Sequence, residues 1–252
     1  MLIVYRYSDA SQQGAGEKYK LALATKQNCL LNFLRAFDVV EKHRMVLIAD
    51  NVSDASMEWL KEHVPALPAL PARGIIRTDY KSGAHSFLHA VCFAMQLDVP
   101  DDTIVYLVED DYIHAPGAHA VLEEGMSVGD YVTLYDHKDK YQDPQSSYIY
   151  ATKSCHWRTT PSTTMTFATR KGTLVSDFDI YLEYCKTGYP YDHEMFLALG
   201  KEKQRRLVSS IPGYSTHAET AWLSPCRDWE CYLADAYLAD AYRVETAETR
   251  DG

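Results

Sequence analysis

An apolar run that ends in three carboxylates constrains this chain more than any other stretch of its sequence. Residues 104–108 read Ile-Val-Tyr-Leu-Val, and Glu109, Asp110 and Asp111 follow directly. A run this short and this rich in β-branched residues predicts a strand that is buried in a parallel sheet. Because side chains alternate along an extended chain, Glu109 and Asp111 should point one way and Asp110 the other.

The acidic end of this strand predicts a binding site for a divalent cation. In open α/β sheets, ligands bind beyond the carboxyl ends of the strands. Carboxylates at that edge suit a hard cation such as Mg²⁺ or Mn²⁺, which could in turn hold a diphosphate. The alternative interpretation is an exposed acidic turn that binds nothing. The buried strand that leads into the cluster favours the metal site.

Composition and charge narrow the range of partners. The 252 residues are 46% hydrophobic and 24% charged, and 25 basic against 35 acidic side chains give a net charge of −10. This charge disfavours a nucleic-acid partner, although a metal ion could still bring a nucleotide to the chain. No apolar run reaches the ~18 residues that a transmembrane helix needs. No basic-then-apolar leader opens the sequence.

The cysteines indicate a reducing compartment. Six of them occur, at positions 29, 92, 155, 185, 226 and 231, without a C-x-x-C pair, and several fall in apolar periodic runs. We interpret them as buried free thiols rather than as a disulfide framework or a zinc site. Together with the lack of a leader and of a membrane span, they lead us to expect a cytoplasmic protein.

The first 114 residues alternate strands with helices. We predict strands at Leu2–Tyr7, Met45–Ala49, Arg73–Thr78 and the acidic run, and apolar residues at helical spacing mark the helices between them. The order β-α-β-α-β-α-β implies a parallel sheet with right-handed crossovers. No G-x-G-x-x-G follows the first strand and no P-loop motif occurs, which disfavours a dinucleotide-binding fold and a P-loop.

The second half of the chain has a less regular pattern, with short strands and helices separated by polar loops. The predicted elements are a helix at His119–Glu124, strands at Tyr131–Tyr135, Tyr148–Thr152 and Thr163–Ala168, helices at Asp177–Lys186 and Met195–Lys203, a last strand at Val208–Ile211 and a helix at Asp228–Arg243. Gly188 can end the first of the two later helices. Pro65–Pro71 is predicted to be a stiff connector.

The order of these parts resembles the GT-A-fold glycosyltransferases. Three short motifs carry the resemblance: Glu109-Asp-Asp111, Asp192-His-Glu194 and Ser215-Thr-His217. It implies an α/β fold of GT-A-like (Rossmann-like) type, with a mixed, mostly parallel sheet flanked by helices, in a single domain over residues 1–245. Residues 1–114 would be the nucleotide- and metal-binding half, 115–225 the acceptor half, 226–245 a C-terminal helix and 246–252 a tail. The sequence departs from the family in having Glu at the first position of the D-x-D motif.

The resemblance implies a function as well as a fold. The expected activity is metal-dependent transfer of a sugar from a nucleotide-sugar, with a UDP-sugar favoured, to a hydroxyl of a saccharide or glycan acceptor, with inversion. One alternative is a nucleotidyltransferase that makes nucleotide-sugars, whose Gly-rich first loop Gln12–Lys18 matches only faintly. The other is a non-catalytic carbohydrate-binding protein of the same fold.

The resemblance assigns metal ligands at two places in the chain. Asp111, the last carboxylate of its motif, would bind Mn²⁺ or Mg²⁺ directly. Glu109 and Asp110 would hold the ribose or a metal-bound water, and Glu109 is also a candidate ligand. His217 lies in a segment rich in turn and hydroxyl residues that could fold over the site as a flexible loop. It would complete the metal site, because neutral imidazole ligates Mn²⁺ well, although a lone histidine is more often a surface residue.

Three further residues are candidates for contact with the nucleotide. Asp50 ends the second strand, where the family hydrogen-bonds the base or ribose; an aspartate that only caps a turn is an equally good interpretation. Lys81 and His85 follow the third strand and could meet the diphosphate. A solvated surface role for both is the simpler interpretation.

The acidic motif Asp192-His-Glu194 supplies the candidate catalytic base. A sugar hydroxyl must lose its proton as it attacks the anomeric carbon, and a positioned carboxylate can accept that proton. The resemblance places Asp192 in this role, with Glu194 as the second candidate. Capping of a helix is the alternative role for Asp192, since aspartate favours that position.

Overall fold

Four parallel strands form one half of the central sheet. The computed structural model describes residues 1–9, 21–39, 44–64 and 74–237. The four strands are β1 (Leu2–Tyr7), β2 (Arg44–Asp50), β3 (Ile75–Thr78) and β4 (Ile104–Glu109), and they lie in the order β3-β2-β1-β4. Successive residues of β1 enter opposite cores: Val4 packs on one face of the sheet and Tyr5 on the other. The predicted parallel sheet with buried strands is therefore confirmed.

Five strands extend this sheet on the far side of β4. They are β9 (Phe167–Arg170), β6 (Tyr131–Thr133), β10 (Leu207–Ile211), β8 (His156–Thr159) and β7 (Ile149–Ala151), in that order. Only β9 and β8 run against the other seven, so the predicted mixed, mostly parallel sheet is confirmed. Most boundaries shift by a few residues from the prediction, and two differences are larger. Residues 156–159, expected as a connection, form β8, and the strand expected at 163–168 begins at residue 167.

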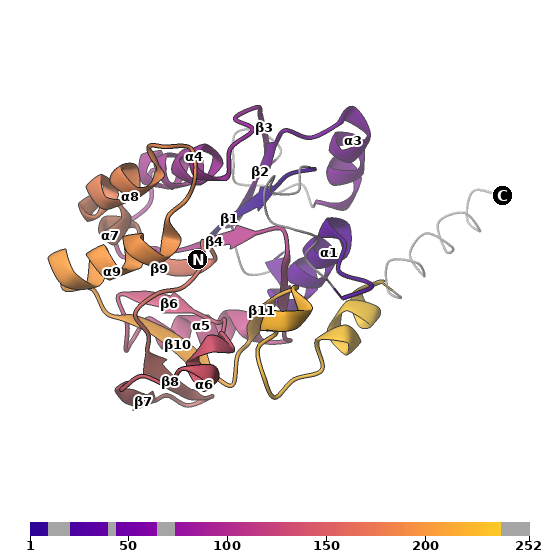
Figure 1. The fold of residues 1–252 in the computed structure, drawn as a ribbon. Coiled ribbons are helices and arrows are strands. Elements are labelled where there is room, and N and C mark those ends of the chain that lie inside the picture. The colour runs from indigo at the N-terminus through magenta and orange to yellow at the C-terminus, as the bar shows by residue number, and fades with distance from the viewer. Residues whose placement is uncertain (10–20, 40–43, 65–73, 238–252) are drawn as a thin grey trace.

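Helices cover both faces of the sheet (Figure 1). One layer holds α1 (Lys26–Ala36), α3 (Asp54–His63) and α5 (Ala118–Gly125); the other holds α4 (Gly83–Gln96), α7 (Lys171–Ser176), α8 (Phe178–Cys185) and α9 (Asp192–Glu202). Side-chain hydroxyls cap three of them, because Thr25, Ser53 and Ser82 each accept a hydrogen bond from a backbone N–H of the first turn. A short helix, α6 (Asp139–Gln142), lies in the loop after β6.

A small second sheet joins two segments that are distant in sequence. Strand β5 (Tyr112–His114) starts directly after the acidic motif and pairs antiparallel with β11 (Ser215–His217). Residues 215–217 were expected in a flexible loop, but Ser215 and Thr216 are fully buried in this sheet. The strand forms because Thr216 pairs with Ile113, whose side chain packs in a separate apolar cluster with Trp229. Strand β10 is therefore not the last strand.

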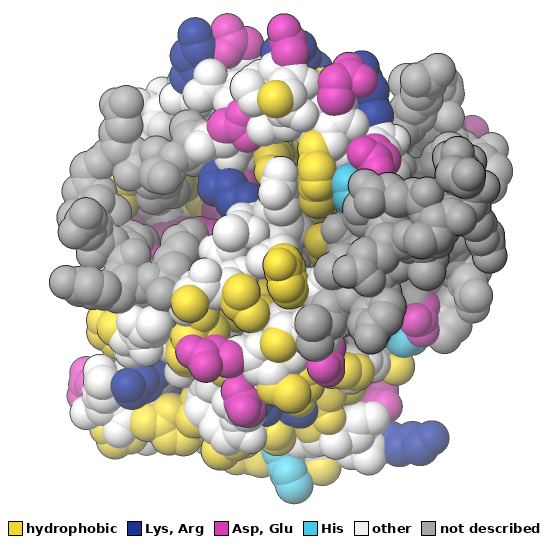
Figure 2. Space-filling view, turned by 90° about the vertical axis from the view of Figure 1, so that its right-hand side faces the viewer, with side chains coloured by type: hydrophobic (Ala, Val, Ile, Leu, Met, Phe, Trp, Pro, Cys, Tyr) yellow, Lys and Arg dark blue, Asp and Glu magenta, His cyan; other side chains and the backbone are white. Residues whose placement is uncertain are grey.

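The six cysteines differ in their exposure to solvent. All six cysteines are free, but Cys226 and Cys231 are exposed, so burial was correctly predicted only for some of them. Among the described residues, none of the helices combines the length and apolar character that a membrane crossing requires. Acidic and basic side chains are mixed on the face in Figure 2. The predictions for residues 12–18, 65–71 and 246–252 lie outside the described ranges, as does the part of the predicted C-terminal helix beyond residue 237.

Candidate functional site

The carboxylates at the end of β4 turn in different directions. Asp110 turns toward the side of the sheet that carries α1, while Glu109 turns toward α4, as alternation along an extended strand predicts. Asp111 lies in the turn after β4 and meets β11. Each of the three has a basic partner within 3.1 Å. Arg6 and Lys26 therefore compensate the charges of Glu109 and Asp110, whereas His217 compensates that of Asp111 only when its imidazole is protonated.

Glu109 is held by an arginine from the neighbouring strand. Arg6 Nη2 donates to Glu109 Oε1 at 2.8 Å, and Arg6 Nη1 donates to the carbonyl of Gly83 at the start of α4 at 3.1 Å. The guanidinium also lies over the ring of Phe87, 5.6 Å from its centroid. Burial raises the pKa of Glu109, and Arg6 opposes that effect while the charge of Asp111 adds to it. The pair therefore fixes this carboxylate between β1 and α4.

Asp110 makes its contacts on the opposite side of the sheet from Glu109. Its Oδ2 accepts from the backbone N–H of Ser8 at 2.7 Å and lies 3.1 Å from Lys26 Nζ. Lys26 also donates to the carbonyl of Ser8. Burial raises the pKa of Asp110, with the charge of Lys26 opposing it. These contacts tie the end of β1 and the start of α1 to the acidic motif.

Asp111 and His217 meet although they lie 106 residues apart in sequence. His217 Nε2 donates to Asp111 Oδ2 at 3.0 Å, and the carbonyl of Asp111 accepts from the N–H of Ala218 at 3.0 Å. Burial alone would lower the pKa of His217, but the nearby carboxylates, Asp111 first among them, raise it overall. The structure therefore brings together two of the residues predicted to bind metal.

The spacing of this pair fits two ligands of one cation. Neighbouring ligands in an octahedral site, each about 2.1 Å from Mg²⁺, would lie about 3.0 Å apart. Asp111 Oδ2 and His217 Nε2 are separated by 3.0 Å. Within the described residues, no group of three or more His, Cys, Asp or Glu side chains is arranged around one metal position. The pair would leave further corners for water and phosphate oxygens, as is usual for Mg²⁺. A ligand role for Glu109, whose Oε1 bonds Arg6, stays a prediction.

The candidate nucleotide residues lie beside the ends of β2 and β3. Asp50 is buried, and its Oδ1 accepts from Thr78 Oγ1 at 2.8 Å and from the N–H of Tyr80 at 2.7 Å. It therefore shapes the turn after β3, and a contact with base or ribose stays a prediction. Lys81 is exposed and lies 3.4 Å from Asp79. His85 is an exposed residue in the first turn of α4.

Asp192 and Glu194 lie in the first turn of α9. Asp192 is half-buried, and its Oδ1 accepts from the N–H of His193 at 2.8 Å. Burial raises the pKa of Asp192, and the charge of Glu194 adds to that effect. The charge of Asp192 in turn contributes to the raised pKa of Glu109, so the two carboxylates are close enough to interact. Glu194 is exposed.

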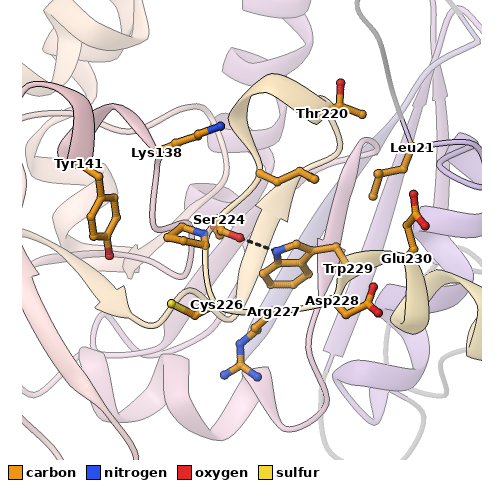
Figure 3. A pocket seen from close by; sticks show the side chains of 12 residues that line it. Leu21, Lys138, Tyr141, Thr220, Ser224, Cys226, Arg227, Asp228, Trp229 and Glu230 are labelled. Atoms are coloured by element: carbon orange, nitrogen blue, oxygen red, sulfur yellow. Dashed lines mark hydrogen bonds between the residues drawn. The ribbon is translucent and has the colours of Figure 1, made fainter.

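A cavity of about 660 Å³ lies beside the segment that follows β11 (Figure 3). Its walls include Lys138 and Tyr141 from the loop after β6 and Thr220 and Arg227 from the C-terminal segment. The indole of Trp229 closes it on one side and donates to the carbonyl of Ser224 at 2.7 Å. None of the three motif carboxylates lines this cavity, so it is distinct from the acidic motif at the end of β4.

Sequence reasoning missed the basic partners of the acidic motif. Arg6 and Lys26 were assigned no role, yet each neutralises one carboxylate. A signal was available for Arg6, because a charge inside an apolar strand must find a partner when it is buried. No local signal marked Lys26, which meets Asp110 only through the packing of α1.

Comparisons with known proteins extend to the fold alone. No protein-family model and no curated sequence matches the chain. Among solved structures, it is similar to the galactosyltransferase LgtC in complex with donor and acceptor sugar analogs, at 9% identity and a TM-score of 0.49 over 94% of this chain and 95% of that one. It is also similar to CMP:2-keto-3-deoxy-manno-octonic acid synthetase complexed with CTP, at 12% identity and a TM-score of 0.48 over 96% of this chain and 98% of that one. A third similar structure is a nucleoside-diphosphate-sugar pyrophosphorylase from Vibrio cholerae RC9, at 12% identity and a TM-score of 0.45 over 83% of this chain and 91% of that one. Both kinds of enzyme considered from the sequence thus occur among these structures, and the likeness does not choose between them.

Proposed function

We propose that the chain is a metal-dependent glycosyltransferase that takes a sugar from a nucleotide-sugar, with a UDP-sugar as favoured donor. The observation that carries the proposal is the contact between Asp111 and His217, which lie 3.0 Å apart at the carboxyl edge of the sheet. Ligands of open α/β sheets bind at that edge. An oxygen and a neutral imidazole nitrogen are suitable ligands for Mn²⁺ or Mg²⁺.

The donor side of the proposed site consists of a position for a cation, beside which two ion pairs fix the neighbouring carboxylates. A divalent cation bound there would neutralise the diphosphate and polarise its bond to the sugar. Arg6 holds Glu109 against α4, and Lys26 holds Asp110 against the end of β1. These two ion pairs therefore keep two carboxylates away from the phosphates. Asp111 and His217 remain to orient the donor through the cation.

The acceptor hydroxyl needs a base on the other side of the donor sugar. Asp192 comes from α9, in the second half of the chain, and interacts electrostatically with Glu109. Burial raises its pKa, which makes the carboxylate a better proton acceptor. With the cation held by Asp111, a base on Asp192 would favour attack opposite the leaving diphosphate. This geometry would invert the anomeric centre.

Binding of UDP with and without metal tests the proposal. We expect the parent protein to bind UDP in Mn²⁺ and to lose most of that affinity in EDTA, because a ligand held through a cation needs the cation. Asp111→Asn should remove the metal-dependent part. Asp143→Asn changes an exposed acidic residue in the loop after α6 and serves as the matched control. Equal UDP affinity in Mn²⁺ and in EDTA would refute the proposal.

A second assay separates transfer from nucleotide-sugar synthesis. A glycosyltransferase supplied with UDP-sugars and Mn²⁺ releases UDP, slowly to water and faster to an acceptor. A nucleotidyltransferase supplied with nucleoside triphosphate and sugar phosphate releases pyrophosphate instead. Release of pyrophosphate without release of UDP would reassign the same site to the second reaction.

A further inference from the structure

A partly exposed tryptophan lies five residues beyond His217, the proposed metal ligand. Trp222 ends a turn of 3₁₀ helix, η1 (Thr220–Trp222), and 37% of its surface is exposed. Its carbonyl accepts from Tyr135 Oη at 2.7 Å, which anchors the turn to the end of β6. The indole is therefore held in place by its backbone while part of the ring system faces solvent.

The indole stacks on a histidine that has a carboxylate partner. The rings of Trp222 and His137 lie 5.2 Å apart with an angle of 22° between their planes. His137 Nδ1 lies 2.7 Å from Asp139 Oδ1, which fixes the rotation of the imidazole. Burial lowers the pKa of His137, with Asp139 opposing that effect, so the neutral ring is favoured. A neutral imidazole with Nδ1 engaged offers Nε2 for a hydrogen bond.

The loop that carries His137 is fixed by contacts of the neighbouring residue, Asp136. Asp136 is fully buried and pairs with Arg158 of β8. Tyr141 Oη donates to Asp136 Oδ2 at 2.6 Å, and the guanidinium of Arg158 lies over the Tyr141 ring, 4.7 Å from its centroid. The surface formed by Trp222, His137 and Asp139 is therefore preformed and would need little rearrangement to bind a ligand.

A continuous row of rings connects this surface to the proposed metal ligands Asp111 and His217. His137 lies edge-on to Tyr135 at 5.0 Å, Tyr135 to Tyr112 at 5.6 Å, and Tyr112 to His217 at 5.3 Å. The row runs from His217 through Tyr135, just after β6, and not through α4. A molecule bound to Trp222 would therefore be separated from the proposed cation position by this row of rings and would not occupy it.

The chemistry of the surface suits a neutral polyol. An aromatic face packs well against the apolar face of a pyranose, and polar groups at its edge hydrogen-bond the hydroxyls. Here these groups are Nε2 of His137 and Oδ2 of Asp139, which also accepts from Lys140 at 2.8 Å, while Oδ1 of Asp139 is buried against His137. The charges beside the surface do not favour an anion, because the cation of Lys140 is paired with Asp139 at 2.8 Å and the buried Glu219 adds a negative charge near Tyr135. We propose that Trp222 and the His137–Asp139 pair form a binding subsite for a sugar ring of a neutral saccharide. That this saccharide is the acceptor rests on the proposed function; that it binds here does not.

Intrinsic fluorescence tests the subsite directly. A panel of neutral disaccharides (lactose, maltose, cellobiose and sucrose) is titrated into the full chain, because stacking on a partly exposed indole changes its emission. Trp222→Phe keeps a smaller ring and the backbone bond to Tyr135. Trp59→Phe is the matched control, since Trp59 also stacks on a histidine, His63, at 4.1 Å, but on α3. We expect one sugar or more to bind the parent and the control equally, and the Trp222 variant about tenfold more weakly.

A second readout guards against a general effect on the fold. Saturation-transfer NMR on the same disaccharides reports binding without relying on tryptophan, and His137→Gln should weaken it as well. Equal affinity of the parent and the Trp222 variant, or no binding of any disaccharide to the parent, would overturn the subsite. UDP binding in Mn²⁺ is measured on the same samples. If sugar binds at Trp222 while UDP does not bind, the proposed transferase fails and the subsite stands.

Discussion

His114 should make the stability of this protein fall in mild acid. The imidazole is fully buried on β5, with the rings of Phe33 and Phe37 edge-on to it at 5.1 and 5.2 Å. Its Nε2 shares a hydrogen bond with Tyr106 Oη at 2.8 Å. Burial lowers the pKa of His114 from 6.5 to about 3. The neutral ring is therefore the form that the folded protein accommodates.

The sign and size of the effect follow from linkage. An unfolded chain protonates this imidazole as the pH falls below about 6.5, whereas the folded chain does so only near a pH of about 3. Stability contributed by neutral His114 is thus fully present above a pH of about 6.5 and is lost as the pH falls toward about 3. One pH unit corresponds to about 1.4 kcal/mol of differential protonation. Between about pH 7.5 and about pH 5, the expected loss from this residue is about 2 kcal/mol.

Urea denaturation of two variants isolates this contribution. His114→Gln retains a polar group that can bond Tyr106 but does not titrate. Near neutral pH the variant should be less stable than the parent, because it loses the ring contacts of His114 with Phe33 and Phe37. Between about pH 7.5 and about pH 5, however, it should lose about 2 kcal/mol less than the parent does. All other ionisable groups are shared and cancel in this difference. His156→Gln removes an exposed imidazole from β8 and serves as the control.

Parallel curves would refute the reasoning. If the free energy of unfolding of the parent and of His114→Gln falls equally over this pH range, burial of His114 does not control its protonation. The same result can be checked by NMR, since the imidazole carbon protons of a histidine with a pKa of about 3 should not titrate above about pH 5.

Three other outcomes are expected. Asp192→Asn should lower the rate of sugar transfer by about 10²–10⁴-fold with little change in donor affinity. The anomeric coupling constant of the product, measured by NMR, should show inversion in the parent. A fully active variant or a retained configuration would contradict the mechanism. His217→Ala should weaken Mn²⁺ binding by about tenfold or more in a metal titration, and curves that overlay those of the parent would exclude a ligand role. Arg205→Met should destabilise the fold by about 3–5 kcal/mol in urea, because it leaves the fully buried carboxylate of Asp177 without its ion pair at 2.8 Å; a loss below about 1 kcal/mol would contradict this.

Local sequence patterns were sufficient for the first half of the sheet. The apolar runs at residues 2–7 and 104–108 are strands, and Glu109 and Asp110 point to opposite sides of the sheet as predicted. Strand β4 ends at Glu109, so the alternation cannot be followed to Asp111, which lies in the turn after the strand. The hydroxyl caps at Ser53 and Ser82 are local as well, since each accepts from a backbone N–H three residues further along the chain.

Contacts between residues that are distant in sequence could not be predicted from such local patterns. His217 was expected in a flexible loop because Ser, Thr and Gly surround it, yet pairing with β5 makes residues 215–217 a strand. The polar strand β8 lacks an apolar period and forms because β10 and β7 pair with it on either side. Arg6 could be predicted to need an anion, but which carboxylate it meets is decided by the register of β1 against β4, in which Arg6 lies opposite Glu109.

The pairing of β5 with β11 has a consequence for how the protein is made. On the ribosome, β1 to β4 emerge before β11, and the acidic motif can reach its place at the end of the parallel strands while His217 is still unmade. His217 follows Asp111 by 106 residues, and its contact with Asp111 requires β11 to add to β5. A nascent chain would therefore carry the carboxylates without their histidine. The proposed site would acquire its metal-binding pair only after the segment with β11 has left the ribosome.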